Sequence, residues 1–170
     1  MTMPFSMYQA AAPGILQTLK AVNGVLDKAE AYATEKKVDP TVLLNYRLAP
    51  DMFALTRQVQ LVTDFAKSTM ARLAGQEVPK YEDTEKTIPE LKARIAKVTS
   101  YVQGFKPSDL DGSESRDVTL PIGGQPMTFK GQDYLVNFAL PNFYFHATAA
   151  YAILRHCGVN IGKRDFLARS

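Results

Sequence analysis

The chain has 170 residues, of which 46% are hydrophobic, and this is enough for one well-buried core in a single domain spanning residues 1–170. Its net charge of +3 comes from scattered lysines and arginines, so we expect neither a nucleic acid nor a membrane as a partner. Residues 1–19 carry no charge, but they lack the basic start of a signal peptide. No apolar run is long enough for a membrane span, and the single Cys157 cannot form an internal disulfide. We expect a soluble, cytoplasmic protein.

Four long segments have hydrophobic residues at helical spacing, which predicts an all-α four-helix bundle. The expected helices lie at about residues 12–35, 51–74, 88–103 and 132–157. The first is expected to start near Pro13, because proline is tolerated in an opening turn. The third is preceded by the capping box Thr87 to Glu90. A further short helix is predicted at residues 41–46.

The second helix is predicted to have one dry face and one wet face. Its apolar residues Leu55, Val59, Val62 and Phe65 share one side when they are placed 100° apart. Its polar residues fall opposite and are expected to face water: Arg57, Gln60, Asp64 and Lys67.

A short β-hairpin insert is predicted at about residues 117–129, before the last helix. Two strand-like runs flank the turn Gly123-Gly124, a common hairpin signal. Pro121 and Pro126 lack a backbone N–H, which confines such a hairpin to the edge of the fold.

The last predicted helix contains Pro141, which removes a backbone donor and clashes with the preceding turn. A kink or break is therefore expected at this residue. The tail after Gly158 is predicted to be an extended strap, held by Ile161 and Phe166.

Polar side chains interrupt the apolar faces of two of these helices. Asn142 and His146 lie one turn apart on the inward stripe of the last helix, and Asp51 and Gln58 fall within the apolar arc of the second. A buried polar group without a partner costs on the order of 1–3 kcal/mol, so we expect these groups to meet one another or to bind something. The sequence predicts a polar pocket around His146 in the bundle core.

Each of these residues also has a structural interpretation. A histidine on an apolar face is more often a hydrogen-bonded core residue than a ligand, and Asp51 could equally cap its helix. His156 lies about 15 Å along the helix axis from His146, so the two cannot share one metal ion. Cys157 at the helix end is expected to be a small buried hydrophobic residue rather than a nucleophile.

Five segments and the end of the last helix resemble a known bacterial family. The segments are Leu48-Ala-Pro-Asp-Met-Phe53, Arg57-Gln-Val-Gln60, Tyr81-Glu-Asp-Thr-Glu85, Ala139-Leu-Pro-Asn-Phe-Tyr-Phe-His146 and Gly162-Lys-Arg-Asp-Phe166, and the helix ends in Ile153-Leu-Arg-His-Cys-Gly158. The chain resembles a branch of unknown function grouped with the DinB-like superfamily, whose members include metalloenzymes. The resemblance covers nearly the whole chain and implies a four-helix bundle that is frequently dimeric.

The resemblance also implies where a metal would bind. Metal-binding relatives hold a divalent ion with one histidine of the second helix and two histidines of the last, four residues apart. His146 matches the second of that pair, Asn142 stands in the place of the first, and Gln58 is the nearest inward residue to the missing third. One imidazole and two amides are a weak ligand set for nickel or zinc, so we expect the three-histidine site to be degenerate, without a cofactor.

Two functions follow. The favoured one is a small-ligand-binding or purely structural polar pocket formed by His146, Asn142, Gln58 and Asp51, in a protein that forms homodimers. The alternative is an enzyme of the thiol transferase or isomerase type that the resemblance implies. It would use either His146 as a general base, or a weakly held nickel or zinc ion completed by Asp51 or Glu30. We favour the first, because fold analogy is a weak warrant for activity.

Overall fold

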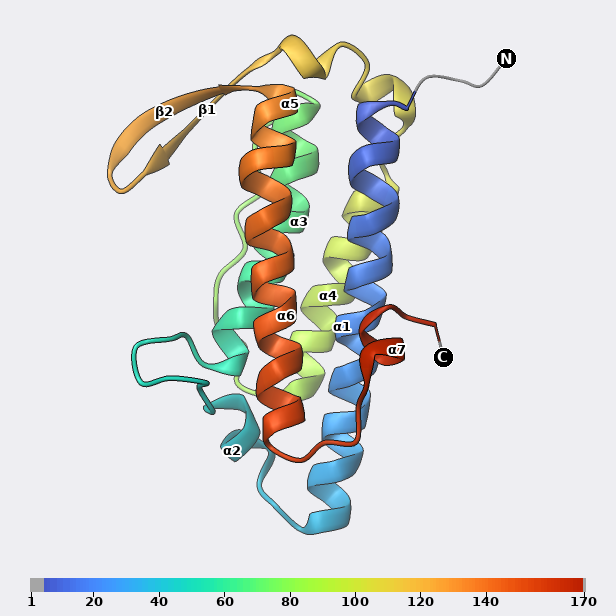
Figure 1. Ribbon diagram of the computed structural model, residues 1–170, viewed down its shortest axis with the longest axis vertical. Coiled ribbons are helices and arrows are strands. Elements are labelled where there is room, and N and C mark those ends of the chain that lie inside the picture. The colour runs from blue at the N-terminus through green and yellow to red at the C-terminus, as the bar shows by residue number, and fades with distance from the viewer. Residues whose placement is uncertain (1–4, 170) are drawn as a thin grey trace.

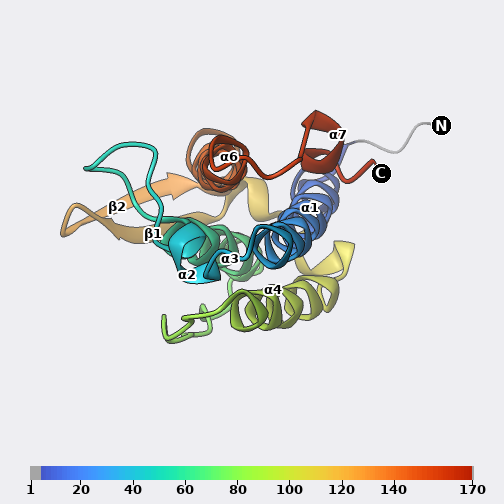
Figure 2. The same ribbon diagram turned by 90° about the horizontal axis from the view of Figure 1, so that it is seen from below.

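The computed structural model describes residues 5–169 and shows an elongated bundle of four helices, with a hairpin projecting from one end (Figure 1). The bundle helices are α1 (Met7–Lys36), α3 (Leu55–Leu73), α4 (Ile88–Gln103) and α6 (Leu140–His156). Seen along the bundle, α6 and α4 lie on opposite sides, with α1 and α3 between them (Figure 2). The predicted all-α four-helix bundle with a hairpin insert is confirmed. Among the residues described, no helix combines the length and hydropathy needed to cross a membrane.

Helix α1 begins at Met7, five residues before the predicted start. Ser6 Oγ accepts a hydrogen bond from the Gln9 backbone N–H at 3.2 Å, and Gln9 Oε1 accepts one from the Ser6 N–H at 3.1 Å. This capping box satisfies two of the free donors at the helix start. Pro13 is therefore inside α1 on its exposed side, and the prediction that it marks the first turn was wrong.

Helix α3 begins at Leu55, four residues after the predicted start. The preceding residues form a turn closed by the Met52 N–H donating to the Ala49 carbonyl at 3.0 Å. The Leu55 N–H donates to the carbonyl of Tyr46 at 3.0 Å, just after the short helix α2 (Pro40–Leu44), and Ala54 is the N-cap. Asp51 is exposed in this turn and lies outside α3, so the prediction that it falls within the apolar arc of the second helix was wrong.

Helix α4 has the predicted bounds and the predicted cap. Thr87 Oγ1 accepts a hydrogen bond from the Glu90 N–H at 3.3 Å, and Glu90 Oε2 accepts one from the Thr87 N–H at 3.0 Å. Between α4 and the hairpin, the chain forms two single turns, η1 (Pro107–Asp109) and η2 (Ser113–Ser115).

The hairpin pairs β1 (Asp117–Ile122) with β2 (Gln125–Lys130) in antiparallel register. Gly123 and Gly124 have φ values of 58° and 82°, the left-handed backbone that a tight two-residue hairpin turn requires. Pro121 lies opposite Pro126. In the alternating ladder this pair follows the hydrogen-bonded pair that closes the turn, so both prolines fall where the backbone groups point outward. They interrupt both edges of the hairpin, which discourages further strand pairing.

The residues before Pro141 form a widened helical turn instead of a break. After the short α5 (Gly131–Asp133), η3 (Tyr134–Ala139) is a π-helix that continues directly into α6. Pro141 has no N–H to donate to a carbonyl in the preceding turn, and the wider turn accommodates both the missing bond and the ring. A π-turn of this kind often occurs near a functional site.

The tail contains a short helix, α7 (Lys163–Phe166), where an extended strap was predicted. Asp165 accepts a hydrogen bond from the Gly162 N–H at 2.8 Å and pairs with Lys28 of α1 at 2.6 Å. Ile161 is buried and the Phe166 ring packs on Tyr151, with ring centroids 5.7 Å apart. The tail thus lies across α1 and α6, as Figure 1 shows.

Candidate functional site

His146 lies on the side of α6 that faces α3. Its side chain is 9% exposed, and its ring stacks on Phe65 of α3 with centroids 5.6 Å apart and planes 21° apart. The ring of Phe145 meets it edge-on at 5.3 Å. Two aromatic side chains therefore fix the plane of the imidazole.

A chain of two hydrogen bonds fixes the proton on this imidazole. Gln58, which is buried on α3, donates from Nε2 to the carbonyl of Phe53 at 3.2 Å. A backbone carbonyl can only accept, so the amide nitrogen of Gln58 must face Phe53 and its Oε1 must face His146. The 2.8 Å contact between Gln58 Oε1 and His146 Nδ1 is therefore donated by the ring. Neutral His146 carries its proton on Nδ1, and Nε2 holds a free lone pair.

The Nε2 atom of His146 has no protein partner and is accessible to solvent. Across residues 5–169, Ser113 Oγ is the single side-chain nitrogen or oxygen that is both fully buried and without a hydrogen bond. His146 Nε2 has no hydrogen bond either, and it is not fully buried. A largely buried ring thus presents one nitrogen lone pair outward.

The surroundings keep His146 neutral. Burial lowers the pKa of the imidazole, because the cation loses hydration, and the positive charge of Arg57 lowers it further. The guanidinium of Arg57 lies 6.0 Å from the centre of the Phe53 ring. Phe53 is also the residue whose carbonyl accepts the hydrogen bond from Gln58. At neutral pH His146 is a weak base rather than a cation.

The other predicted pocket residues do not join His146. Asn142 is half-buried, and its Nδ2 donates to the Phe138 carbonyl in the π-turn at 2.7 Å. Asp51 is exposed in the turn before α3, and Glu30 lies 3.9 Å from Lys92 of α4. The structure therefore brings together His146 and Gln58 and leaves the other three elsewhere.

The two remaining residues considered from the sequence lie at the end of α6. His156 is the last residue of α6, and its ring is 5.4 Å from that of Tyr46. Cys157 is half-buried, and burial raises the pKa of its thiol. A raised thiol pKa disfavours the nucleophilic thiolate.

The donor set around His146 does not fit a divalent metal. Within residues 5–169 no three His, Cys, Asp or Glu side chains are grouped so that they could share an ion. The oxygen of Gln58 is occupied by the Nδ1 proton, which leaves His146 Nε2 as the one strong donor. A single imidazole is insufficient for a zinc or nickel site.

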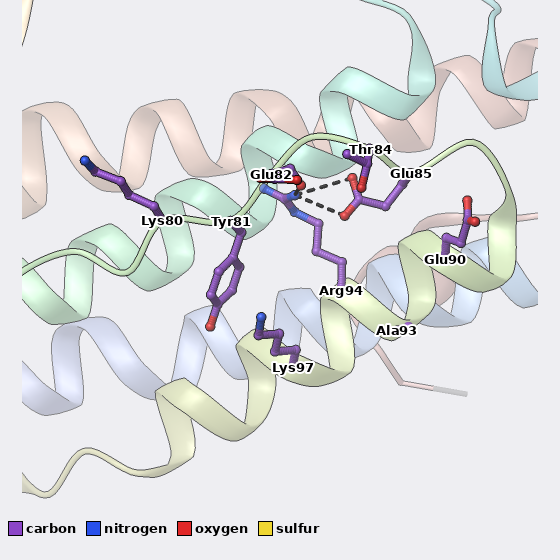
Figure 3. Close-up of a pocket in the computed structure, with 9 residues that line it drawn as sticks. All are labelled: Lys80, Tyr81, Glu82, Thr84, Glu85, Glu90, Ala93, Arg94 and Lys97. Atoms are coloured by element: carbon purple, nitrogen blue, oxygen red, sulfur yellow. Dashed lines mark hydrogen bonds and ion pairs between the residues drawn. The ribbon is translucent and has the colours of Figure 1, made fainter.

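A second polar cluster lies between α3, α4 and the loop that joins them, and sequence reasoning missed it. Arg94 of α4 has a side chain that is 3% exposed. Four of its five N–H groups donate hydrogen bonds within 3.1 Å, to Thr63 Oγ1, the carbonyl of Glu82 and the carboxylates of Glu85 and Asp64. The carboxylate of Asp83 forms a further ion pair with Nη2 at 3.0 Å. Figure 3 shows the loop lying over Arg94, with Glu82 and Glu85 beside its guanidinium.

The predicted wet face of α3 is partly buried beneath this loop, which is a correction. Gln60 and Lys67 are 4% and 5% exposed, and the loop places Glu85 against Gln60 and the Tyr81 ring against Lys67. Gln60 Nε2 donates to Glu85 at 2.9 Å, and Lys67 pairs with Asp64 at 2.6 Å.

A signal for the cluster exists in the sequence. Arg94 falls on the apolar stripe of α4, between Leu91 and Ile95, where an isolated charge would be very costly. The segments Arg57–Gln60 and Tyr81–Glu85, which carried the family resemblance, contact each other here.

A surface hollow of about 540 Å³ adjoins the Arg94 cluster. Tyr81 and Lys97 line it, with the Lys97 Nζ 3.9 Å from the centre of the Tyr81 ring (Figure 3). Four of the five N–H groups of Arg94 donate to protein acceptors, and three carboxylates lie around its charge, so the guanidinium is already occupied by the protein. The cluster holds the loop in place, and His146 is the better candidate for a site.

A solved structure similar to this chain is the crystal structure of a DinB family member protein from Shewanella denitrificans. The two share 45% sequence identity, the match covers 95% of this chain and 91% of that chain, and the TM-score is 0.90. These values confirm a DinB-like protein. The family model described as "Domain of unknown function (DUF1993)" matches residues 7–167, and the chain belongs to this family. The comparison with curated proteins gave no match.

Proposed function

We propose that this DinB-like protein binds a small molecule at His146, and that the ligand donates a hydrogen bond to Nε2. The observation that carries the proposal is the open lone pair on an otherwise fixed, neutral imidazole. The ring is only 9% exposed, yet its one nitrogen without a protein partner reaches solvent, where the donor of a ligand can take the place of water.

The rim of the site favours an apolar or aromatic ligand body. Phe53 and Phe145 are 51% and 56% exposed, which is unusual for phenylalanine. Phe145 contacts the His146 ring, and the Phe53 carbonyl receives the bond from Gln58. A ligand with an O–H or N–H group and a flat apolar body would use both the lone pair and these rings.

The alternative is an enzyme that uses His146 as a general base. A neutral histidine with an accessible nitrogen and a fixed tautomer is what proton abstraction needs, and Gln58 would be its positioning residue. The thiol-transfer or isomerisation chemistry suggested by the family resemblance would use such a base. A metal-dependent version receives no support, because the side chains beside His146 do not make a metal site.

Phenol and toluene form a matched pair of probes for the proposal. They have nearly the same shape, but only phenol can donate to Nε2. We expect phenol to shift the ¹⁵N resonance of His146 Nε2 and to bind at least about 10-fold more tightly than toluene, because toluene leaves the lone pair without a donor.

The variant His146→Phe provides the control, since it preserves an aromatic ring between Phe65 and Phe145. In this variant phenol should lose its advantage over toluene. Equal binding of the two probes to the wild-type protein would contradict the proposal. A His146→Phe variant that loses stability but leaves phenol binding unchanged would show that His146 is a core residue only.

A further inference from the structure

Arg57 of α3 is a partly exposed cation beside the His146 site. It precedes Gln58, which holds the imidazole, and its guanidinium carbon lies 6.0 Å from the centre of the Phe53 ring at the rim. Its side chain is 37% exposed, whereas that of Arg94 is 3% exposed. The positive charge of Arg57 lowers the pKa of His146, so this charge acts at the ring in spite of the nearby acids. Arg57 and His146 therefore share one electrostatic environment.

Only one edge of the Arg57 guanidinium is used by the protein. Its hydrogen bonds within residues 5–169 both come from Nη1, to Asp83 at 2.5 Å and to Gln60 at 3.4 Å. Asp83 also pairs with Nη2 of Arg94 at 3.0 Å, so two cations share this one carboxylate. Across the described chain, the Nε–H and Nη2–H donors of Arg57 are therefore free. These two donors are parallel and form the fork that a carboxylate accepts with both of its oxygens.

We propose that Arg57 selects ligands that carry a carboxylate, so that the His146 site takes small aromatic hydroxy acids. This inference rests on the proposed function and adds the class of ligand to it. The hydroxyl group donates to His146 Nε2, and the carboxylate accepts from the free fork of Arg57. The flat body between these two groups lies against the exposed rings of Phe53 and Phe145.

A carboxylate matches Arg57 better than either a neutral group or a phosphate. A hydrogen bond from a guanidinium to a carboxylate is charge-assisted and about twice as strong as a neutral one. A phosphate dianion brings a second negative charge, and Asp83 already lies on the Nη1 side of the guanidinium. His146 is neutral and offers no second cation. One negative charge is therefore what this part of the site can balance.

Hydroxybenzoates and hydroxybenzamides are matched probes for this inference. The 4-hydroxy acid and the 4-hydroxy amide have nearly the same shape and the same hydroxyl group, but only the acid is charged at pH 7. The two 3-hydroxy compounds offer a second spacing between the groups. In calorimetric titrations of the full chain, the better hydroxybenzoate isomer should bind at least about 10-fold more tightly than its own amide.

Two variants separate the guanidinium from the overall charge of the protein. In Arg57→Gln the acid should lose its advantage over the amide. Arg155→Gln removes the same charge at an exposed position further along α6 and should keep the advantage. Asp83 retains Arg94 in the first variant, and circular dichroism spectra check the fold of both variants. The comparison of acid and amide in the wild-type protein does not depend on either variant.

Equal binding of acid and amide to the wild-type protein, for both isomers, would overturn the inference. An advantage of the acid that survives in Arg57→Gln would overturn it too, because the carboxylate would then bind elsewhere. The proposed function fails by a different result, namely equal binding of phenol and toluene. Phenol that binds more tightly than toluene, together with an acid that binds no better than its amide, would leave the His146 proposal standing and remove the role of Arg57.

Discussion

The two polar regions of this bundle differ in how completely their hydrogen bonds are satisfied. Arg94 is buried with four hydrogen-bonded N–H groups and three carboxylates around its charge, whereas His146 is nearly as buried and uses only one of its two ring nitrogens. Burial of a polar side chain is therefore not by itself the mark of a site. What distinguishes His146 is a nitrogen that has no protein partner and reaches solvent, so that it can bind a ligand, whereas the guanidinium of Arg94 is engaged by groups that hold the fold.

The largest expected effect is on stability, at Arg94. Replacing Arg94 by Met leaves the largely buried Glu85 without a cation, while the more exposed Asp64 and Asp83 keep Lys67 and Arg57. Removing one partner of a buried ion pair costs about 3–5 kcal/mol. Urea unfolding should show this loss. The exposed pair Lys130–Asp117 is the control, because Lys130→Met should cost less than about 1 kcal/mol. Equal losses in the two variants would remove the structural role assigned to Arg94.

A smaller effect is expected at Gln58. Gln58→Leu removes the acceptor for the His146 Nδ1 proton, and leaving a buried donor unpaired costs about 1–3 kcal/mol of the free energy of unfolding. Gln58→Glu keeps an acceptor at the same place. If Gln58 fixes the proton of His146, NMR should show a mixture of His146 tautomers in the Leu variant and a protonated ring in the Glu variant. An unchanged tautomer in Gln58→Leu would show that Gln58 does not fix the proton.

The pH dependence of stability should also carry the signature of His146. Burial lowers its pKa in the folded state, so the unfolded chain binds the proton at higher pH than the folded chain does. The stability that neutral His146 contributes is fully present above the ordinary histidine pKa of about 6.5. It is lost as the pH falls from there toward the lower pKa of the folded state. Chemical denaturation between pH 7 and pH 5 should show a loss of stability that is smaller in His146→Gln. His156→Gln, at the end of the same helix, is the comparison variant. A loss that His146→Gln leaves unchanged would contradict the assignment.

The smallest expected effect is at Asp51. This carboxylate is exposed in a turn and does not cap α3, whose N-cap is Ala54. Asp51→Asn should change the free energy of unfolding by less than about 0.5 kcal/mol and leave phenol binding unchanged. A larger change in the free energy of unfolding, or any change in phenol binding, would show that Asp51 does belong to the His146 site.

The sequence was sufficient for the bundle, because helical periodicity and the Thr87–Glu90 cap depend on local patterns. It also placed Gln58 and His146 on inward faces, which their hydrogen bond requires. The start of α3 was misplaced, because it depends on the bond from Leu55 to the distant Tyr46 carbonyl. That error is what put Asp51 on the dry face.

The burial of Gln60 and Lys67 could not be predicted from helix periodicity alone. Their side of α3 is polar in sequence, and only the path of residues 74–87 and the arrival of Arg94 cover it. For these two residues a contact between distant elements overrode a local pattern. Asn142 differs, since its side chain bonds the Phe138 carbonyl four residues earlier, in the π-turn ahead of Pro141.

The most direct test of the central claim is the ¹⁵N NMR spectrum of the His146 ring at pH 7. The structure predicts a neutral ring with the proton on Nδ1 and with Nε2 unprotonated, because Gln58 Oε1 accepts from Nδ1. The Nε2 resonance should therefore have the chemical shift of an unprotonated imidazole nitrogen and should move when phenol is added. A ring protonated on Nε2, or a cationic ring at this pH, would contradict the account.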